Sequence, residues 1–76
     1  MPKIDLYEYI EHKIGMSVPE IIADSPERFR VIRTEALRDL VIMNRIAGTG
    51  YEISYPPEVL EDAECRRLID TEKAVR

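Results

Sequence analysis

The chain has 76 residues, of which 45% are hydrophobic and 34% are charged, with a formal net charge of −4. This composition excludes an intrinsically disordered chain, and the length fits one domain, residues 1–76, with a small hydrophobic core. The acidic balance argues against nonspecific binding to nucleic-acid phosphates, and the sequence has no run of about 20 apolar residues to cross a bilayer.

The single cysteine, Cys65, has no second cysteine in the chain with which to form a disulfide, which indicates a reducing compartment. Residues 1–14 carry charges throughout and lack the continuous apolar stretch of a secretory signal. We therefore expect a cytoplasmic protein that does not bind a membrane.

Two short helices are predicted at about residues 5–14 and 18–24. Asp5 and Ser17 are suitable capping residues, and each is followed three positions later by a glutamate, a spacing typical of helix starts. Gly15 is suited to ending the first helix, and the proline at position 26 ends the second.

A long helix is predicted over residues 26–47, between a Ser-Pro-Glu start signal and a Gly-Thr-Gly stop signal. At about 100° per residue, most of its apolar side chains fall on one broad face, which we expect to be the core side. The members of this face are Phe29, Ile32, Ala36, Leu40, Met43, Ile46 and Ala47.

Leu37 and Val41 fall on the opposite side of the long helix, among several arginines. Residues 40–43 are therefore apolar all the way round, which a helix lying on one surface does not need. Either other helices of the same chain cover both sides, or a second molecule covers the back. Because arginine is enriched in protein interfaces, we expect a partner surface here. Its residues are Arg30, Leu37, Arg38, Val41 and Arg45.

Residues 51–55 alternate apolar and polar side chains, which predicts one short strand. No second strand is indicated elsewhere in the sequence. The strand then has three possible arrangements: extended packing on the helices, pairing with its copy in a homodimer, or addition to a partner's sheet. Tyr51, Ile53 and Tyr55 form the second expected contact surface.

Two prolines at positions 56 and 57 end this strand and begin a last helix, at about residues 57–73. Together these elements predict a mostly α fold. We expect a small four-helix domain, with two short N-terminal helices, one long central helix, one C-terminal helix and one short extended segment.

A short helix followed by a long one invites comparison with the helix-turn-helix of DNA-binding proteins. Arg28, Arg30 and Arg33 would then contact the nucleic acid. However, the turn has no glycine, and Glu27 and Phe29 occupy the start of the would-be recognition helix. Nucleic-acid binding is therefore the alternative hypothesis.

No motif indicates catalysis or metal binding. His12 and Cys65 are the only histidine and cysteine, their spacing does not support a catalytic pair, and a zinc site needs several such ligands. The acidic residues between positions 58 and 64 are explained by the preference of helix starts for negative charge. We expect no enzyme, metal or cofactor. Our first hypothesis is a small acidic helical protein–protein interaction module, a regulator, adaptor or inhibitor, acting alone or as a homodimer.

Overall fold

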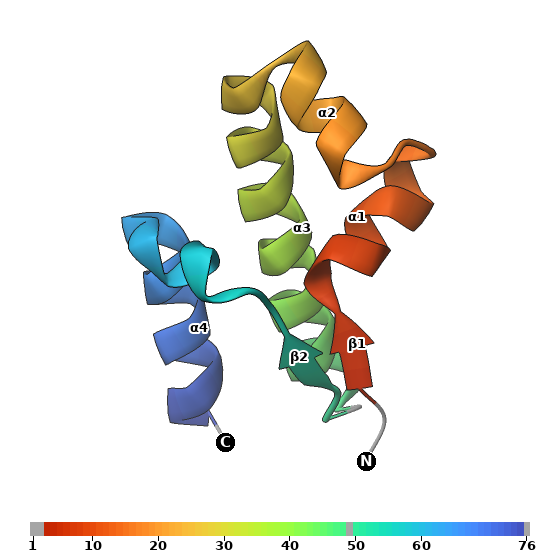
Figure 1. Ribbon diagram of the computed structural model, residues 1–76. Helices are drawn as coiled ribbons and strands as arrows, with labels where there is room; N and C mark the ends of the chain where they lie inside the picture. Colours follow the sequence, from red (N-terminus) through yellow and green to blue (C-terminus); the bar gives the residue numbers. More distant parts are fainter. Residues whose placement is uncertain (1–2, 49, 76) are drawn as a thin grey trace.

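The computed structural model describes residues 3–48 and 50–75 (Figure 1). The elements are β1 (Lys3–Asp5), α1 (Leu6–Ile14), α2 (Val18–Asp24), α3 (Pro26–Ala47), β2 (Glu52–Ser54), the 3-10 helix η1 (Pro57–Glu61) and α4 (Ala63–Val75). The predicted mostly α fold is confirmed. Within the described residues, no helix is both long enough and apolar enough to span a bilayer.

The first three helices begin and end where the sequence predicts, to within one residue. The Asp5 carboxylate accepts the backbone N–H groups of Tyr7 and Glu8 at 2.9 and 3.1 Å, and thereby caps α1. Ser25 caps α3 in the same way, and Gly48 ends α3 with a left-handed φ of 62°. Local capping chemistry therefore determines these boundaries.

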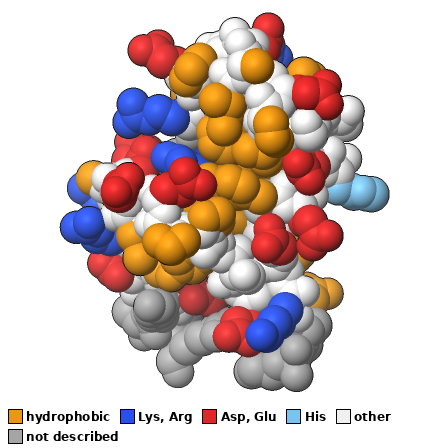
Figure 2. All heavy atoms as spheres, in the orientation of Figure 1, with side chains coloured by type: hydrophobic (Ala, Val, Ile, Leu, Met, Phe, Trp, Pro, Cys, Tyr) orange, Lys and Arg blue, Asp and Glu red, His pale blue; other side chains and the backbone are white. Residues whose placement is uncertain are grey.

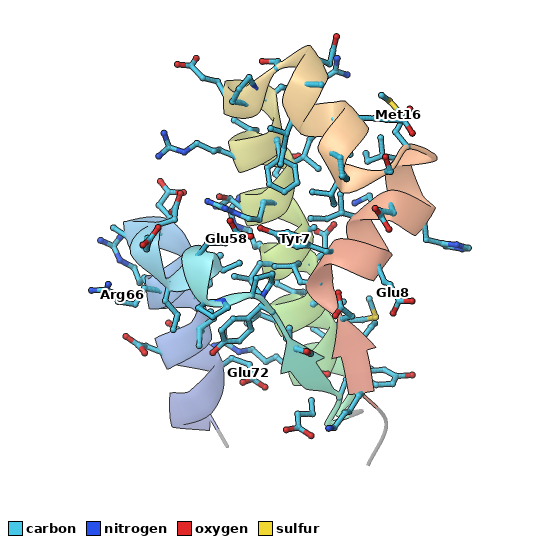
Figure 3. The ribbon with its side chains drawn as sticks, in the orientation of Figure 1. Tyr7, Glu8, Met16, Glu58, Arg66 and Glu72 are labelled. Atoms are coloured by element: carbon cyan, nitrogen blue, oxygen red, sulfur yellow. The ribbon has the colours of Figure 1, made fainter. Side chains whose placement is uncertain are left out.

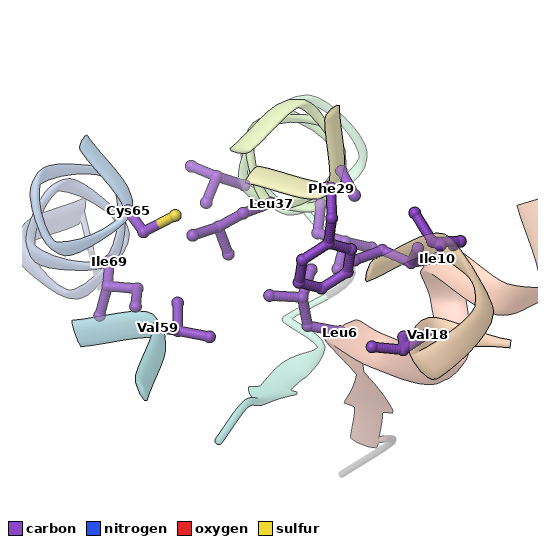
Figure 4. Packing of buried hydrophobic residues seen from close by; sticks show 12 residues of the cluster. Leu6, Ile10, Val18, Phe29, Leu37, Val59, Cys65 and Ile69 are labelled. Atoms are coloured by element: carbon purple, nitrogen blue, oxygen red, sulfur yellow. The ribbon is translucent and has the colours of Figure 1, made fainter. Parts of the chain in front are cut away.

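Both sides of α3 are covered by other elements of the same chain. α1 and α2 pack on one side of it and α4 on another, and Figure 4 shows Leu37 between the side chains of the two groups. Leu37 is 0% exposed and Val41 is 6% exposed. The expectation that these two residues lie on the back of the helix, outside the core, is corrected: they belong to the core.

The buried face of α3 is rotated relative to the predicted one. It includes Leu37, Val41 and the charged Arg33, because the C-terminal part of the chain packs there. Met43 and Ile46, which were expected in the core, are 38% and 81% exposed. The last turns of α3 therefore present apolar side chains to solvent.

The strand at residues 52–54 does not stand alone. β1 and β2 form a two-stranded parallel sheet in which Ile4 is opposite Ile53. β1 has three residues and leads directly into the α1 cap, so it is too short to show a periodic pattern. The expectation of a single unpaired strand is therefore corrected.

The last predicted helix, residues 57–73, is in fact two elements. η1 ends at Glu61, Asp62 adopts an extended conformation with φ −86° and ψ 122°, and α4 then begins. The Asp62 carboxylate accepts the backbone N–H groups of Glu64 and Cys65 at 3.0 and 3.2 Å. Asp62 therefore caps a new helix and interrupts the predicted one.

Candidate interaction surfaces

A hollow lies between α3, β2 and α4. Buried residues from the two helices lie at its base, and residues of the β2 segment border it. Its lining residues are Leu37, Val41, Glu52, Ile53, Tyr55, Ile69 and Glu72. The volume is about 220 Å³, below the roughly 300–1,000 Å³ of most small-molecule sites. The hollow is therefore of a size for protein side chains.

Four of the predicted partner-binding residues come together in this hollow. Leu37 and Val41 contribute from α3, while Ile53 and Tyr55 contribute from the β2 segment. The sequence places these pairs on two separate surfaces, and folding joins them because β2 lies against α3. Tyr51 is half-buried just before β2 and does not line the hollow.

Asn44 holds the start of the β2 segment against α3. Its side-chain amide donates to the Tyr51 carbonyl at 2.9 Å, and its side-chain oxygen accepts the Tyr51 N–H at 3.0 Å. The same amide nitrogen lies 3.4 Å from a carboxylate oxygen of Glu72 on α4. Asn44 was missed in the sequence, where its only signal is a polar side chain following the apolar residues 40–43.

One edge of β2 faces away from β1. β1 pairs with one edge, and α4 lies on the other side of β2 in the view of Figure 1. Within the described part of the chain, the backbone of β2 forms no hydrogen bond to backbone outside the ladder with β1. This edge lies beside the hollow, because Glu52 and Ile53 line it together with Ile69 and Glu72 of α4.

The border of the hollow is acidic. Glu52 is exposed on β2 and Glu72 is half-buried on α4, so two carboxylates border an apolar base. Figure 3 shows Glu72 on the side of α4 that is near β2. In Figure 2, hydrophobic side chains form a band across the visible face, with acidic side chains on both sides of it.

A second cluster of polar groups joins α1, α3 and η1 to the start of α4, and its Arg33 and Asp62 side chains are largely enclosed. Arg33 is only 8% exposed, and its guanidinium lies 3.3 Å from the Asp62 carboxylate. Tyr7 donates its hydroxyl hydrogen to Glu58 at 3.1 Å, and these two residues lie side by side in Figure 3. Arg30 approaches the same Asp62 at 3.6 Å from the outside.

The cluster shifts the pKa of two of its acids in opposite directions. The backbone N–H groups of Cys65 and Glu64, with the cation of Arg33, lower the pKa of Asp62 against the opposing effect of burial. Burial raises the pKa of the Tyr7 hydroxyl, Arg33 opposes this, and Glu58 adds to it. At neutral pH these contacts therefore stabilise Asp62 as the carboxylate and Tyr7 as the protonated hydroxyl. The cluster serves to join α3 to α4.

The three arginines of the nucleic-acid hypothesis each face a carboxylate of the same chain. Arg28 lies 3.9 Å from Asp24, while Arg30 and Arg33 both face Asp62. The groove beside Arg30 also contains several acidic residues. They are Glu27, Glu35, Asp62 and Glu64. Phosphate groups would meet negative charge there, so this arrangement does not favour nucleic acid.

The outer side of α3 carries a separate apolar patch. Ile42 is 44% exposed there, and it lines a shallow hollow with Asp39, Met43, Ile46 and Ala47. Arg38 and Arg45, two of the predicted partner residues, are exposed on the same helix. This patch, Ile42–Met43–Ile46, is a second candidate contact surface.

The two residues considered for nucleophilic chemistry are in unrelated environments. His12 is exposed on α1, whereas Cys65 is fully buried, 3.7 Å from the Thr34 hydroxyl. Among the described residues, no three histidine, cysteine, aspartate or glutamate side chains are grouped in a way that could hold a metal ion.

Comparisons with known protein families, with curated proteins and with solved structures found no match to this chain.

Proposed function

We propose that this protein is a small protein–protein interaction module, a regulator, adaptor or inhibitor, that binds another protein at the hollow between β2 and α4. The observation that carries the proposal is the combination at one place of a hollow with buried aliphatic side chains at its base, an open strand edge and an acidic border. Concave apolar sites with a few polar groups at the edge are typical of recognition sites.

A photo-crosslinking amino acid at position 52 tests the proposal. The Glu52 side chain is exposed beside the hollow, so a bound partner would lie within reach of the crosslinker. The matched control carries the same crosslinker in place of Glu20, an exposed acidic residue on α2. We expect a protein adduct in cells from position 52 and none from position 20. Equal adducts from both positions, or none from either, would overturn the proposal.

The crosslinked protein is then identified by mass spectrometry, purified and titrated against the unmodified module. Glu52→Lys reverses a charge at the border without entering the core, so it should weaken binding by about tenfold, or about 1.4 kcal/mol. Glu20→Lys makes the same change away from the hollow and should leave the affinity unchanged. If the identified protein binds Glu52→Lys as tightly as it binds the unmodified module, binding occurs elsewhere.

Self-association as a homodimer is a second candidate interaction, and the exposed patch of Ile42, Met43 and Ile46 favours it. Small domains bury a modest share of their apolar surface, and association covers what remains. The molecular mass in solution should rise with concentration, and the double variant Ile42→Ser/Ile46→Ser should stay monomeric. Ile22→Ser, which removes an aliphatic side chain 40% exposed on α2, is the control. A constant monomer mass would exclude the homodimer.

The nucleic-acid alternative has a direct test of its own. Binding through phosphate contacts weakens steeply as salt is added. We expect no retention of single- or double-stranded DNA or RNA at low salt. Retention that falls with salt and is lost in Arg28→Ala would instead support the helix-turn-helix hypothesis, since Arg28 is highly exposed.

A further inference from the structure

We infer that the segment bound at the hollow is an extended peptide that adds a strand to the free edge of β2, with apolar side chains alternating with basic ones. The inference rests on the proposed function and specifies the chemistry of the partner. Three features of the hollow lead to it: the edge, the direction of the β2 side chains and the charge at the border.

The first feature is the free edge of β2. In a two-stranded sheet each strand has one paired edge and one outer edge, and the outer edge presents backbone donors and acceptors. In Figure 1 the outer edge of β2 is on the side of α4, and residues of both elements line the hollow. An added strand would satisfy these groups, and its backbone would lie along the opening of the hollow.

The second feature is the alternation along β2. Glu52 and Ser54 are exposed and Ile53 is half-buried, while Glu52 and Ile53 both line the hollow. Neighbouring residues of an added strand alternate in the same way. Its residues on the Ile53 side would point toward Val41 and Ile69, so they must be apolar. A volume of about 220 Å³ accommodates aliphatic side chains there.

The third feature is the charge. Side chains on the other side of the added strand would lie next to Glu52, and Glu72 borders the same hollow. Directly opposed charges on neighbouring strands attract when they differ in sign and repel when they match. Lysine or arginine therefore suits the outward positions, and the net charge of −4 favours approach of a basic segment.

A short synthetic peptide of alternating lysine and valine, with both ends blocked, tests the inference by NMR on the ¹⁵N-labelled full chain. We expect saturable shifts at residues 52–55 and around Ile69, with a dissociation constant of about 1 mM or lower because the ladder is short. A peptide of alternating glutamate and valine should bind about tenfold more weakly, because it meets the acidic border.

Comparing the lysine–valine peptide with a version in which every backbone nitrogen is methylated distinguishes strand addition from simple charge attraction. The methylated version keeps the charge and most of the apolar surface but cannot donate backbone hydrogen bonds, so we expect binding to weaken by about tenfold or more. Glu52→Lys should weaken binding of the unmethylated peptide, and Glu20→Lys should not. Equal binding of the methylated peptide, shifts centred elsewhere, or no binding at several millimolar would overturn the inference.

The crosslinking experiment distinguishes failure of the inference from failure of the proposed function. If position 52 captures a protein whose affinity depends on Glu52, while the lysine–valine peptide does not bind, the module binds a folded surface and strand addition is wrong. If neither a protein nor the peptide binds at the hollow, both proposals are wrong.

Discussion

The guanidinium of Arg33 on α3 lies 3.3 Å from the carboxylate of Asp62, the residue that caps α4. One carboxylate therefore neutralises an enclosed cation and also accepts the backbone N–H groups at the start of a helix. The two residues are 29 positions apart in the sequence. Their contact fixes where α4 begins relative to α3, and α4 in turn forms one wall of the hollow.

Substitution of Asp62 separates its two roles. Asp62→Asn keeps a good capping side chain but removes the charge opposite Arg33, so we expect a loss of about 1–3 kcal/mol in the free energy of unfolding. Asp62→Ala removes the cap as well and should cost about 1 kcal/mol more. Urea unfolding followed by circular dichroism measures both. Asp70→Asn, on the exposed side of α4, is the control. Equal stability of the Asn variant and the unmodified protein would show that the ion pair contributes nothing.

The backbone hydrogen bonds of the Asp62 cap, with the cation of Arg33, predict how stability depends on pH. The pKa of Asp62 is lowered in the folded protein, so its contribution is complete above the unfolded-state pKa of about 3.9 and is lost as the pH falls through the folded-state pKa. The stability difference between the unmodified protein and Asp62→Asn should therefore be constant near neutral pH and shrink below about pH 4. Urea titrations of both proteins across this range provide the measurement. A difference that grows on acidification would contradict the direction of the pKa shift.

Asn44→Ala tests the attachment of β2 to α3. The variant loses the two hydrogen bonds to the Tyr51 backbone, and we expect a cost of about 1–3 kcal/mol, partly offset by the better helix propensity of alanine. The Tyr51 amide should also exchange its hydrogen faster, because its acceptor is gone. Arg45→Ala, at the exposed neighbouring position, should change neither quantity. Unchanged exchange at Tyr51 in Asn44→Ala would mean that other contacts hold this segment.

The helices could be predicted from the sequence because their boundaries depend on local chemistry. Asp5, Ser17 and Ser25 cap from positions adjacent to their helices, and Gly48 ends the longest helix through its own backbone conformation. No contact with a distant residue is needed to find these signals.

The packing of α3 could not be predicted in the same way, because it depends on a distant residue. Arginine is normally exposed to solvent. The side of α3 that carries Arg33, Leu37 and Val41 was therefore not predicted to be the core side. The enclosure of Arg33 depends on contacts that the helix pattern does not show, among them the Asp62 carboxylate 29 residues later and the hydroxyl of Tyr7. The β1 strand was missed for a related reason: its pairing with β2 joins segments separated by three helices.

For the candidate site, the sequence indicated the residue types and the folded chain supplied their arrangement. Ile53 and Tyr55 were expected as contact residues from their alternation, and they do border a hollow. The contribution of Ile69 and Glu72 was not expected, because the start of α4 is shifted by the Asp62 cap. Because the start of the last helix was predicted wrongly, the contribution of α4 to the hollow was not predicted.

The thiol of Cys65 provides a measure of how often α4 separates from α3. Cys65 is fully buried beside Thr34, so a thiol reagent reaches it only when α4 opens. We expect slow modification of the native protein and fast modification in urea. Asp62→Ala removes both the ion pair and the cap of α4 and should increase the native rate by at least about tenfold, which corresponds to about 1.4 kcal/mol or more in the opening free energy. Arg67→Ala, an exposed change on α4, is the control and should leave the rate unchanged. Native modification as fast as in urea would mean that α4 does not protect Cys65, and the hollow would then lack a stable wall.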